Sequence, residues 1–210
     1  MKPHRLVIVG AGGFGRELLN WAHEAAGCTW SEVTWIDDNA AALDAFSYPQ
    51  KRIGGLKDYT PGATDLCVVA IGSPKARQHV VEELRARGAA FATLRHPSVV
   101  VSATARIGTG CVLCPMSFVS ADAVVEEFVH INALGTVGHD VHVGAYTTLS
   151  AHVDLTGGVK TGQRAFFGSG ARVIPGIRIG ADAVVGAGAT VMRSVQDGVT
   201  VFAQPARKLQ

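Results

Sequence analysis

The sequence is poor in charged residues. Asp, Glu, Lys and Arg make up 17% of its 210 residues, and 19 basic against 17 acidic side chains leave a formal net charge of +2. No run of basic residues occurs along the chain. Because nucleic acids and anionic membranes are bound mainly through clustered Lys and Arg, we expect neither as a partner.

Long apolar runs and an export signal are also missing. No stretch of about 18 apolar residues occurs, so no membrane-spanning helix is predicted. The apolar run near the N-terminus, Leu6–Val9, is too short for a signal peptide and is followed by glycines rather than a cleavage site. We therefore predict a cytoplasmic protein.

Cysteine is scarce, and its placement does not indicate a metal centre. The chain has 4 cysteines, Cys28, Cys67, Cys111 and Cys114, which we expect to be reduced because no export signal is predicted. The last two form a CxxC, but there is no second cysteine pair to complete a zinc site. Both also fall inside the repeat described next, where Cys111 takes a small inward position. Packing is therefore favoured over redox or metal chemistry, and no metal is predicted.

What the sequence does contain is a strict repeat of six residues. Every sixth residue from Val101 to Val191 is apolar at fifteen of sixteen positions, and Thr161 is the exception. Neither the period of a strand nor that of a helix produces this spacing. A fixed short repeat indicates a solenoid, in which three such segments make one coil of about 18 residues and bury a continuous core. Glycine often follows the apolar residue, where a tight turn favours the lack of a side chain.

The residues before the repeat have a different pattern. Short apolar strands alternate with amphipathic helices, which predicts a parallel sheet with right-handed crossovers. The predicted strands are 6–9, 33–36, 66–71 and 91–94, and the predicted helices are 16–24 and 76–87. His96-Pro97 marks the boundary, since the residue before a proline avoids the helical conformation. We predict an α/β Rossmann-like domain over 1–96, a solenoid over 97–196 and a C-terminal tail over 197–210.

A glycine-rich loop follows the first predicted strand. Gly10, Gly12 and Gly15 fit GxGxxG, which lets a phosphate approach the N-terminus of a helix. Asp37 lies 22 residues after Gly15, near the spacing of a ribose contact. The domain is too short for a full dinucleotide fold and lacks its second half. These observations disfavour NAD(P), and a tight turn without a ligand stays open as an alternative.

These segments together resemble a known family. The run from Ile179 to Val191, IGADAVVGAGATV, looks like the bacterial hexapeptide-repeat transferases, which fold as left-handed parallel β-helices. With GAGGFGRE from Gly10 in front and QPAR from Gln204 behind, nearly the whole chain resembles the sialic acid O-acetyltransferase and nucleotide-sugar N-acetyltransferase family (NeuD/PglD-like). The resemblance implies acetyl-CoA as co-substrate and a nucleotide-linked sugar as acceptor.

The resemblance also implies an acceptor site. Gly12, Gly13, Phe14 and Gly15 would carry the phosphates, although some relatives have histidine in place of Phe14. The base or ribose would be held by Asp37 and Asp38, and Gly72 would line the same cleft. Asn132 occupies the position of an asparagine that lines the acceptor pocket.

The register of the repeat places His139 at a turn, where its side chain points outward. It is followed by Asp140, and an imidazole beside a carboxylate is a usable base at neutral pH. Spacing alone leaves an ordinary surface histidine equally open. The resemblance implies that His139 is the general base and that Asp140 raises its basicity.

For the acyl donor, the spacing and the resemblance both point to a row of residues along one edge of the prism. Ser169 and Ala187 lie 18 residues apart, one coil, and should stack along one edge of the prism. The resemblance implies contacts with the coenzyme there, at Thr148, where some relatives have histidine, and at the C-terminal Pro205 and Arg207. A prism with sites on its corners also predicts a homotrimer, and the resemblance implies that the active sites lie between subunits.

We therefore predict direct acetyl transfer from acetyl-CoA to the amine of a nucleotide-linked 4-amino-sugar. O-acetylation of sialic acid or another sugar hydroxyl is the nearest alternative, and a non-catalytic nucleotide-sugar-binding scaffold is another. A metal-dependent hydratase with a carbonic-anhydrase-like solenoid is a further alternative. It would need converging histidines, but no two of the four solenoid histidines are one coil apart: His130, His139, His142 and His152.

Overall fold

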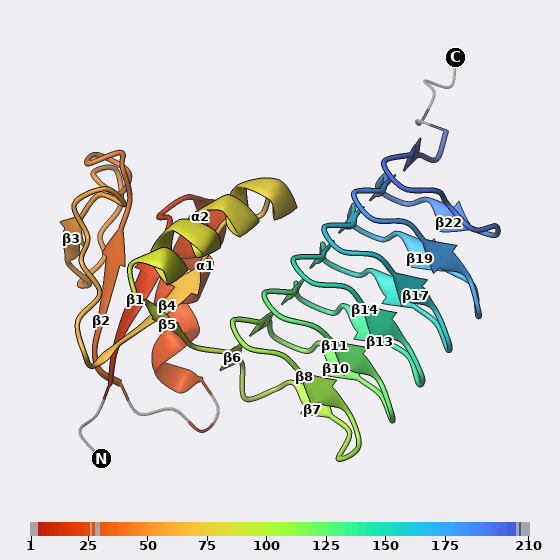
Figure 1. Ribbon diagram of the computed structural model, residues 1–210, viewed down its shortest axis with the longest axis horizontal. Helices are drawn as coiled ribbons and strands as arrows, with labels where there is room; N and C mark the ends of the chain where they lie inside the picture. Colours follow the sequence, from red (N-terminus) through yellow and green to blue (C-terminus); the bar gives the residue numbers. More distant parts are fainter. Residues whose placement is uncertain (1–3, 26, 28–29, 205, 207–210) are drawn as a thin grey trace.

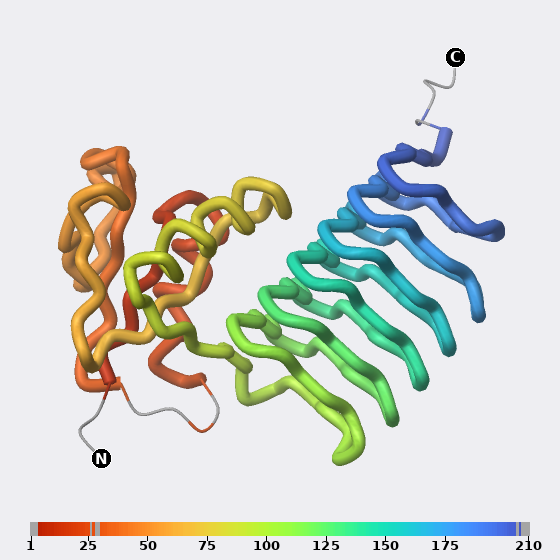
Figure 2. The backbone as a smooth tube through the Cα atoms, in the orientation of Figure 1, coloured from red at the N-terminus to blue at the C-terminus, as the bar shows by residue number. Residues whose placement is uncertain are grey.

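The computed structural model describes residues 4–25, 27, 30–204 and 206. As predicted, an α/β domain precedes a left-handed parallel β-helix (Figure 1). The coils stack regularly along one axis, and the α/β domain lies beside the earlier coils while the last ones project away from it (Figure 2). None of the described helices is long and apolar enough to cross a membrane.

The sheet of the α/β domain is entirely parallel, with strand order β3-β2-β1-β4-β5. Its strands are β1 (His4–Val9), β2 (Trp30–Ile36), β3 (Arg52–Gly54), β4 (Asp65–Val69) and β5 (Ala90–Phe91). The short edge strand β3 was not predicted. The order of strands reverses between β1 and β4, and ligands of such sheets bind at the carboxyl ends of the strands beside this point.

Two helices cover opposite faces of this sheet. They are α1 (Gly13–Trp21), extended by the short 3₁₀ helix η1 (Ala22–Glu24), and α2 (Pro74–Ala86). Leu18 of α1 packs in one cluster with Leu6 and Ile8, whereas Val81 of α2 packs in another cluster with the alternate strand residues. Burial of each such side chain contributes about 1.5–3 kcal/mol. The alternation of the strands thus determines which helix covers which face.

The link between the domains differs from the prediction. The expected strand over 91–94 is two strands, β5 in the α/β sheet and β6 (Leu94–Arg95) in the solenoid. The backbone N–H of Ala92 still donates to Cys67, but that of Leu94 donates to Cys111 in the first coil. The solenoid therefore begins just before His96, because the chain changes sheets within two residues.

The solenoid has three parallel sheets, one on each side of a triangular prism (Figure 1). The α/β domain packs on one of them, which we call the covered face. Its strands are β6 (Leu94–Arg95), β9 (Val112–Leu113), β12 (His130–Ile131), β15 (Thr148–Leu149), β18 (Phe166–Phe167), β21 (Val184–Val185) and β23 (Thr200–Val201). Because β23 pairs with β21, the coils continue into the predicted tail.

The other two sheets are named here after their first strands. The β7 face has β7 (Val100–Val101), β10 (Phe118–Val119), β13 (Thr136–Val137), β16 (Asp154–Leu155), β19 (Arg172–Val173) and β22 (Thr190–Val191). The β8 face has β8 (Arg106–Ile107), β11 (Val124–Val125), β14 (His142–Val143), β17 (Lys160–Thr161) and β20 (Arg178–Ile179).

The sixfold repeat forms the solenoid core, as predicted. The second residue of each strand points inward and stacks on its counterpart one coil away, as Ile131 does on Leu113 and Leu149. Cys111 fills a small inward position, fully buried in the same core, and Cys114 packs in the cluster shared with the α/β domain. Both thiols are free, which fits a packing role.

The glycines after the apolar positions have a different cause from the one expected. Left-handed backbone occurs two residues after these glycines, as at Asp140 and Tyr146, each with φ 59°. Gly144 instead lies directly against the next coil, where an added Cβ would come 2.5 Å from the backbone carbon of Gly162. Close stacking of the coils, not turn conformation, excludes a side chain there.

Thr161, the exception in the apolar series, replaces a backbone interaction. Its hydroxyl accepts the N–H of Gly144 at 3.0 Å, where the regular pattern would use a carbonyl of the next coil. The strand pairing is shortened at the same place, since β14 and β17 pair only through His142 and Lys160. A buried N–H without an acceptor costs about 1–3 kcal/mol, so the hydroxyl is needed where the ladder is interrupted.

Candidate active site

A cleft opens at the carboxyl ends of β1, β2 and β4. Its cavity of about 310 Å³ is lined by Gly12, Asp37, Asp38 and Ile71, among others. Gly72, which follows Ile71 directly, is exposed beside it. The structure thus brings together the residues predicted to hold a nucleotide, at the point where the strand order reverses.

The glycine loop presents backbone donors to this cleft. Gly12 is the N-cap of α1 and has no side chain to occupy the first N–H groups of the helix, which an anion can therefore approach. Gly12 and Gly13 are exposed, but Gly15 is buried, and a Cβ there would lie 2.0 Å from the carbonyl oxygen of Gly10. Gly15 permits strand and helix to pack closely and does not face a ligand, in contrast to its predicted role.

Phe14 is turned toward the solenoid rather than the cleft. Its ring centroid lies 5.0 Å from that of His130 on β12, and the side chain packs in the cluster between the domains. The predicted phosphate contact is therefore limited to the backbone of Phe14, while its side chain joins the loop to the covered face.

The two aspartates hold the walls of the cleft. Asp37 accepts the N–H of Ala11 through Oδ2 at 2.7 Å and that of Asn39 through Oδ1 at 2.8 Å. Asp38 accepts the N–H of Leu56 at 2.7 Å. Both aspartates line the cavity, and each also fixes a loop through its carboxylate. Their contact with a base or ribose stays a prediction.

His139 and Asp140 form a pair on an outward turn of the solenoid. His139 Nδ1 lies 2.7 Å from Asp140 Oδ2, and the two side chains are 69% and 66% exposed. Since a carboxylate only accepts, Nδ1 carries the proton and Nε2 keeps its lone pair. The arrangement is that of a base with an orienting acid, which matches the predicted geometry; its role in catalysis stays a prediction.

The imidazole of His139 rests on the next coil. A Cβ at Gly157 would lie 2.5 Å from Nε2 and 2.6 Å from Cε1, so only glycine leaves room for the ring. Gly157 is outside the set of residues with positive φ. Its role is therefore steric, and sequence reasoning missed it because glycines recur throughout the repeat.

The other predicted side chains lie on a different edge of the prism. Asn132, Ser169 and Ala187 all follow strands of the covered face, in turns that lead to the β7 face; we call this the Asn132 edge. Pairing of Phe167 with Val185 stacks Ser169 under Ala187, as predicted, and both are exposed. His139 lies on the next edge, between the β7 and β8 faces. Within one chain a whole sheet separates His139 from Asn132, Ser169 and Ala187.

The Asn132 edge ends in an exposed aromatic ring. Phe202 follows β23, is 76% exposed and lies one coil beyond Gly186, the residue before Ala187. Sequence reasoning did not identify it, although a lone phenylalanine after the last apolar pair is a detectable signal. The predicted coenzyme residues Pro205 and Arg207 lie outside the described residues.

Thr148 does not fit the predicted contact with the acyl donor. It is 3% exposed, and its hydroxyl donates to the carbonyl of Gly72 at 2.9 Å and accepts from Arg77 Nη2 at 3.0 Å. The side chain thus joins the domains from within. Sequence reasoning did not identify Arg77. Its position on α2 is in phase with the buried Val81 and Leu84, so the sequence places a charged residue on the apolar face of the helix.

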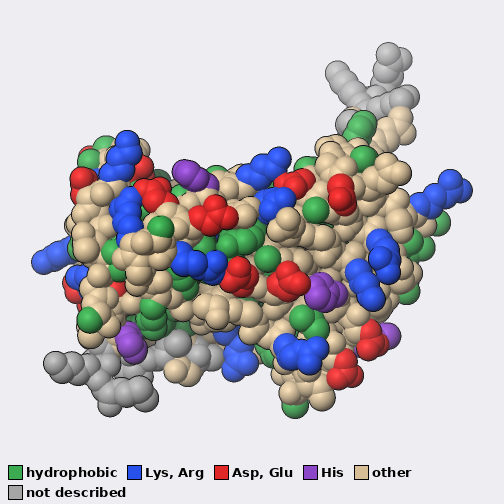
Figure 3. Space-filling model, viewed as in Figure 1, with side chains coloured by type: hydrophobic (Ala, Val, Ile, Leu, Met, Phe, Trp, Pro, Cys, Tyr) green, Lys and Arg blue, Asp and Glu red, His purple; other side chains and the backbone are tan. Residues whose placement is uncertain are grey.

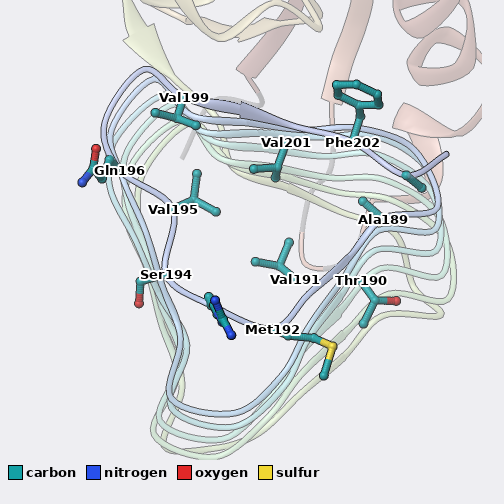
Figure 4. Close-up of a pocket in the computed structure, with 12 residues that line it drawn as sticks. Ala189, Thr190, Val191, Met192, Ser194, Val195, Gln196, Val199, Val201 and Phe202 are labelled. Carbon is teal, nitrogen blue, oxygen red and sulfur yellow. The ribbon is translucent and has the colours of Figure 1, made fainter.

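A larger cavity, about 580 Å³, lies at the open end of the solenoid. Val191, Val195 and Val201 point into it, as the end of the apolar core (Figure 4). It contains no pair of acid and base, and we do not place the active site there. On the face drawn in Figure 3, acidic and basic side chains alternate without a large region of one sign.

The remaining solenoid histidines do not converge. His130 is buried, His142 pairs with Glu126 at 2.7 Å, and His152 is exposed on another turn. Among the described residues, no three His, Cys, Asp or Glu side chains are grouped so that they could hold a metal ion.

Comparison with known proteins identifies both domains. Residues 5–84 match the model of the PglD N-terminal domain, and residues 158–193 match the model of the hexapeptide repeat of succinyl-transferase. The chain is 31% identical to GDP-perosamine N-acetyltransferase of Escherichia coli O157:H7, over 97% of this chain and 95% of that protein.

Solved structures agree over almost the whole length. The acetyltransferase domain of PglB from Neisseria gonorrhoeae, in complex with acetyl coenzyme A, has a TM-score of 0.86 at 30% identity and covers 99% of this chain and 100% of that one. A histidine-to-asparagine variant of perosamine N-acetyltransferase from Caulobacter crescentus, in complex with CoA and GDP-perosamine, has a TM-score of 0.83 at 34% identity. That match covers 96% of this chain and 95% of that one.

Proposed function

The chain belongs to the PglD-like family of hexapeptide-repeat sugar acetyltransferases, and we propose that it acetylates the amine of a nucleotide-linked 4-amino-sugar with acetyl-CoA. The observation that carries the proposal is the His139–Asp140 pair, exposed on a prism edge with Nε2 available as a base. The cleft beside the glycine loop supplies a site for the nucleotide.

The transfer proceeds in one step. Nε2 of His139 takes a proton from the sugar amine as the amine nitrogen attacks the thioester carbonyl carbon of acetyl-CoA. The C–N bond forms, the C–S bond breaks, and the thiolate of coenzyme A leaves and takes up a proton. Asp140 stabilises the imidazolium through the hydrogen bond at Nδ1, and such base catalysis contributes about 10²–10⁴-fold.

We propose that a second copy of the chain completes the site. Asn132 and the proposed coenzyme strip lie on one edge of the β7 face, and His139 lies on the other. In a ring with the β7 faces inward, each His139 edge meets the Asn132 edge of its neighbour, as head-to-tail contacts require. Exposed apolar side chains on and beside this face support the arrangement, and they are Val100, Met116, Phe118 and Leu134. A homotrimer is the closed ring that a triangular prism favours.

The Asn132 edge provides the proposed strip for the coenzyme. Ser169 and Ala187 expose small side chains one coil apart, which leaves room for the pantetheine arm. Phe202 extends the strip with an aromatic surface for the adenine, since bases stack on such rings. Pro205 and Arg207 are proposed to close the groove, with the guanidinium on a coenzyme phosphate. Because acetyl-CoA is a cytoplasmic metabolite, we propose the cytoplasm as the site of action.

Guanosine diphosphate is proposed as the nucleotide. Two relatives that match nearly the full chain have names that state a substrate, and they act on or bind GDP-perosamine. The cleft contributes backbone donors for the diphosphate and two aspartates for the nucleoside.

The test is release of coenzyme A thiol from acetyl-CoA in the presence of GDP-linked and UDP-linked 4-amino-sugars and free sialic acid. We expect turnover with an amino sugar and a decrease in kcat of about 10²–10⁴-fold in His139→Ala. Turnover of sialic acid alone would reassign the reaction to O-acetylation. Normal turnover by His139→Ala would contradict the proposed mechanism.

A further inference from the structure

The most unusual side chain outside the proposed chemistry is Arg77 of α2. It is 0% exposed, enclosed between the α/β domain and the covered face. Among the described residues, no Asp or Glu forms an ion pair with it. Burial lowers the pKa of Arg77 to about 9, and the side chain is therefore still a cation at neutral pH.

The cation is held by oxygen atoms of both domains. On the α/β side, Nη1 donates to the carbonyl of Ile71 at 2.7 Å. On the solenoid side, Nε donates to the carbonyl of Phe128 at 3.0 Å and Nη2 to that of Thr147 at 3.2 Å, with further bonds to Tyr146 and Thr148. The planar fork thus spans the junction in several directions at once.

Burying such a charge is costly, and packing alone does not require it. An unpaired buried ion costs several kcal/mol, and apolar side chains of similar volume often replace buried charges without loss of stability. An apolar residue in phase with Val81 and Leu84 would complete the helix face. The presence of Arg77 therefore points to a need for fixed geometry between the domains.

Arg77 contacts one wall of the nucleotide cleft directly and is linked to the glycine loop on the other side through His130. Ile71 lines the cavity directly. On the other side, Nη1 lies 3.1 Å from Nδ1 of His130, whose ring packs against Phe14 of the glycine loop. Because guanidinium only donates, Nδ1 accepts and Nε2 of His130 carries the proton, buried without a partner in the described residues. One cation therefore fixes the loop after β4 and supports the ring under the glycine loop.

We propose that Arg77 is a positioning residue for the nucleotide sugar. It fixes the cleft in one orientation on the solenoid, so that the sugar amine reaches the acetyl group while the coenzyme strip, on later coils, is unaffected. The inference rests on the proposed function. An error of about 1 Å in the placement of reacting groups can cost about 10²-fold in rate, which is why a rigid junction matters.

Kinetics of Arg77→Lys and Arg77→Met test the proposal, with Arg85→Met as the matched control. Arg85 also joins α2 to the solenoid, through Glu127 at 2.7 Å, but at the exposed surface. We expect kcat/KM for the nucleotide sugar to fall at least about tenfold in both Arg77 variants, with KM for acetyl-CoA within twofold of wild type. Arg85→Met should match wild type. If Arg77 only stabilised the fold, kcat would fall in proportion to the loss of folded protein and the KM values of both substrates would stay at the wild-type level. That outcome would overturn the proposal.

Hydrogen exchange separates this inference from the proposed function. We expect faster amide exchange over 71–73 and 146–148 in Arg77→Lys, and unchanged exchange in Arg85→Met, whether or not the wild type turns over. Unchanged amide exchange in Arg77→Lys overturns the positioning role of Arg77 even if the enzyme is active. If exchange is faster in Arg77→Lys but the wild type does not turn over any of the tested sugars, the positioning role of Arg77 is supported and the acetyltransferase assignment is rejected. If Arg77→Met does not fold, the conservative lysine variant carries both measurements.

Discussion

The imidazole of His139 lies directly on Gly157, the residue that stands one coil further along the prism. The contact fixes the side of the ring that bears Nε2, while Asp140 fixes the side that bears Nδ1. A proposed general base is thus oriented by one hydrogen bond and one steric contact, although it is exposed on a corner.

Gly157→Ala should therefore impair the base without unfolding the protein. The added Cβ would meet Nε2 at 2.5 Å and displace the ring, and the backbone at 157 needs no glycine conformation. We expect kcat to fall about tenfold to 10²-fold, with both KM values within twofold. The control is the double variant with His139→Ala, which should be no slower than His139→Ala alone, because the two changes act on one group. Additive losses would show that Gly157 acts elsewhere.

Thr161→Val should destabilise the solenoid, although it restores the apolar repeat. The change removes the hydroxyl oxygen that accepts the N–H of Gly144, at a cost of about 1–3 kcal/mol. Thr161→Ser keeps the hydroxyl and is the matched control. Urea unfolding measures both. A valine variant as stable as wild type would mean that the ladder closes in the regular way.

The sequence repeat was sufficient to predict the solenoid, its inward residues and the stacking of Ser169 with Ala187, because each follows from a period of six and coils of 18. The cleft was also predictable, since a glycine loop and the ends of parallel strands meet at the point where the strand order reverses. These features depend on local pattern and on topology that the pattern determines.

Contacts between the domains could not be predicted in the same way. Thr148 was assigned to the acyl donor from the family resemblance, yet it faces Gly72 and Arg77 because the α/β domain covers that sheet. Phe14 turns to His130 for the same reason. A periodic pattern gives each residue a face but does not show which face another domain occupies. The charge of Arg77 on an apolar helix stripe was the one available signal.

Phe202→Ala should weaken the use of acetyl-CoA through loss of adenine stacking. Stacking of a base on an aromatic ring contributes about 1–3 kcal/mol, so we expect KM for acetyl-CoA to rise about tenfold. KM for acetyl-pantetheine, which has no adenine, should stay unchanged. Met192→Ala, also exposed but on the His139 edge, is the control and should behave as wild type. An equal rise for both donors would indicate a general defect of the last coil.

Asp65 should make the stability of the α/β domain sensitive to acid. Burial alone raises the pKa of Asp65, but hydrogen bonds from Arg5, Gly62 and Tyr59 outweigh it and bring the pKa below the ordinary 3.8. Below pH 3.8 the unfolded chain takes up the proton first, so this stabilisation is complete above pH 3.8 and is lost as pH falls through the lower folded value. Asp65→Asn should lose about 1.5–3 kcal/mol at pH 7, and the difference from wild type in urea unfolding should shrink below pH 3.8. A difference independent of pH would assign the loss to packing.

Mixing two inactive variants tests whether the active site lies between copies. His139→Ala removes the base on one edge, and Ala187→Tyr fills the coenzyme strip on the other, at an exposed position that should not affect folding. In a head-to-tail ring of randomly mixed chains, a site is complete when its base comes from an Ala187→Tyr chain and its coenzyme strip comes from a His139→Ala chain. This occurs in about a quarter of sites. We therefore expect the mixture, after dissociation and reassembly, to recover about a quarter of wild-type activity, while each variant alone stays inactive. If each site lay within one chain, the mixture would recover no activity, because every chain carries one defect. Size-exclusion chromatography with light scattering would show whether the ring has three members.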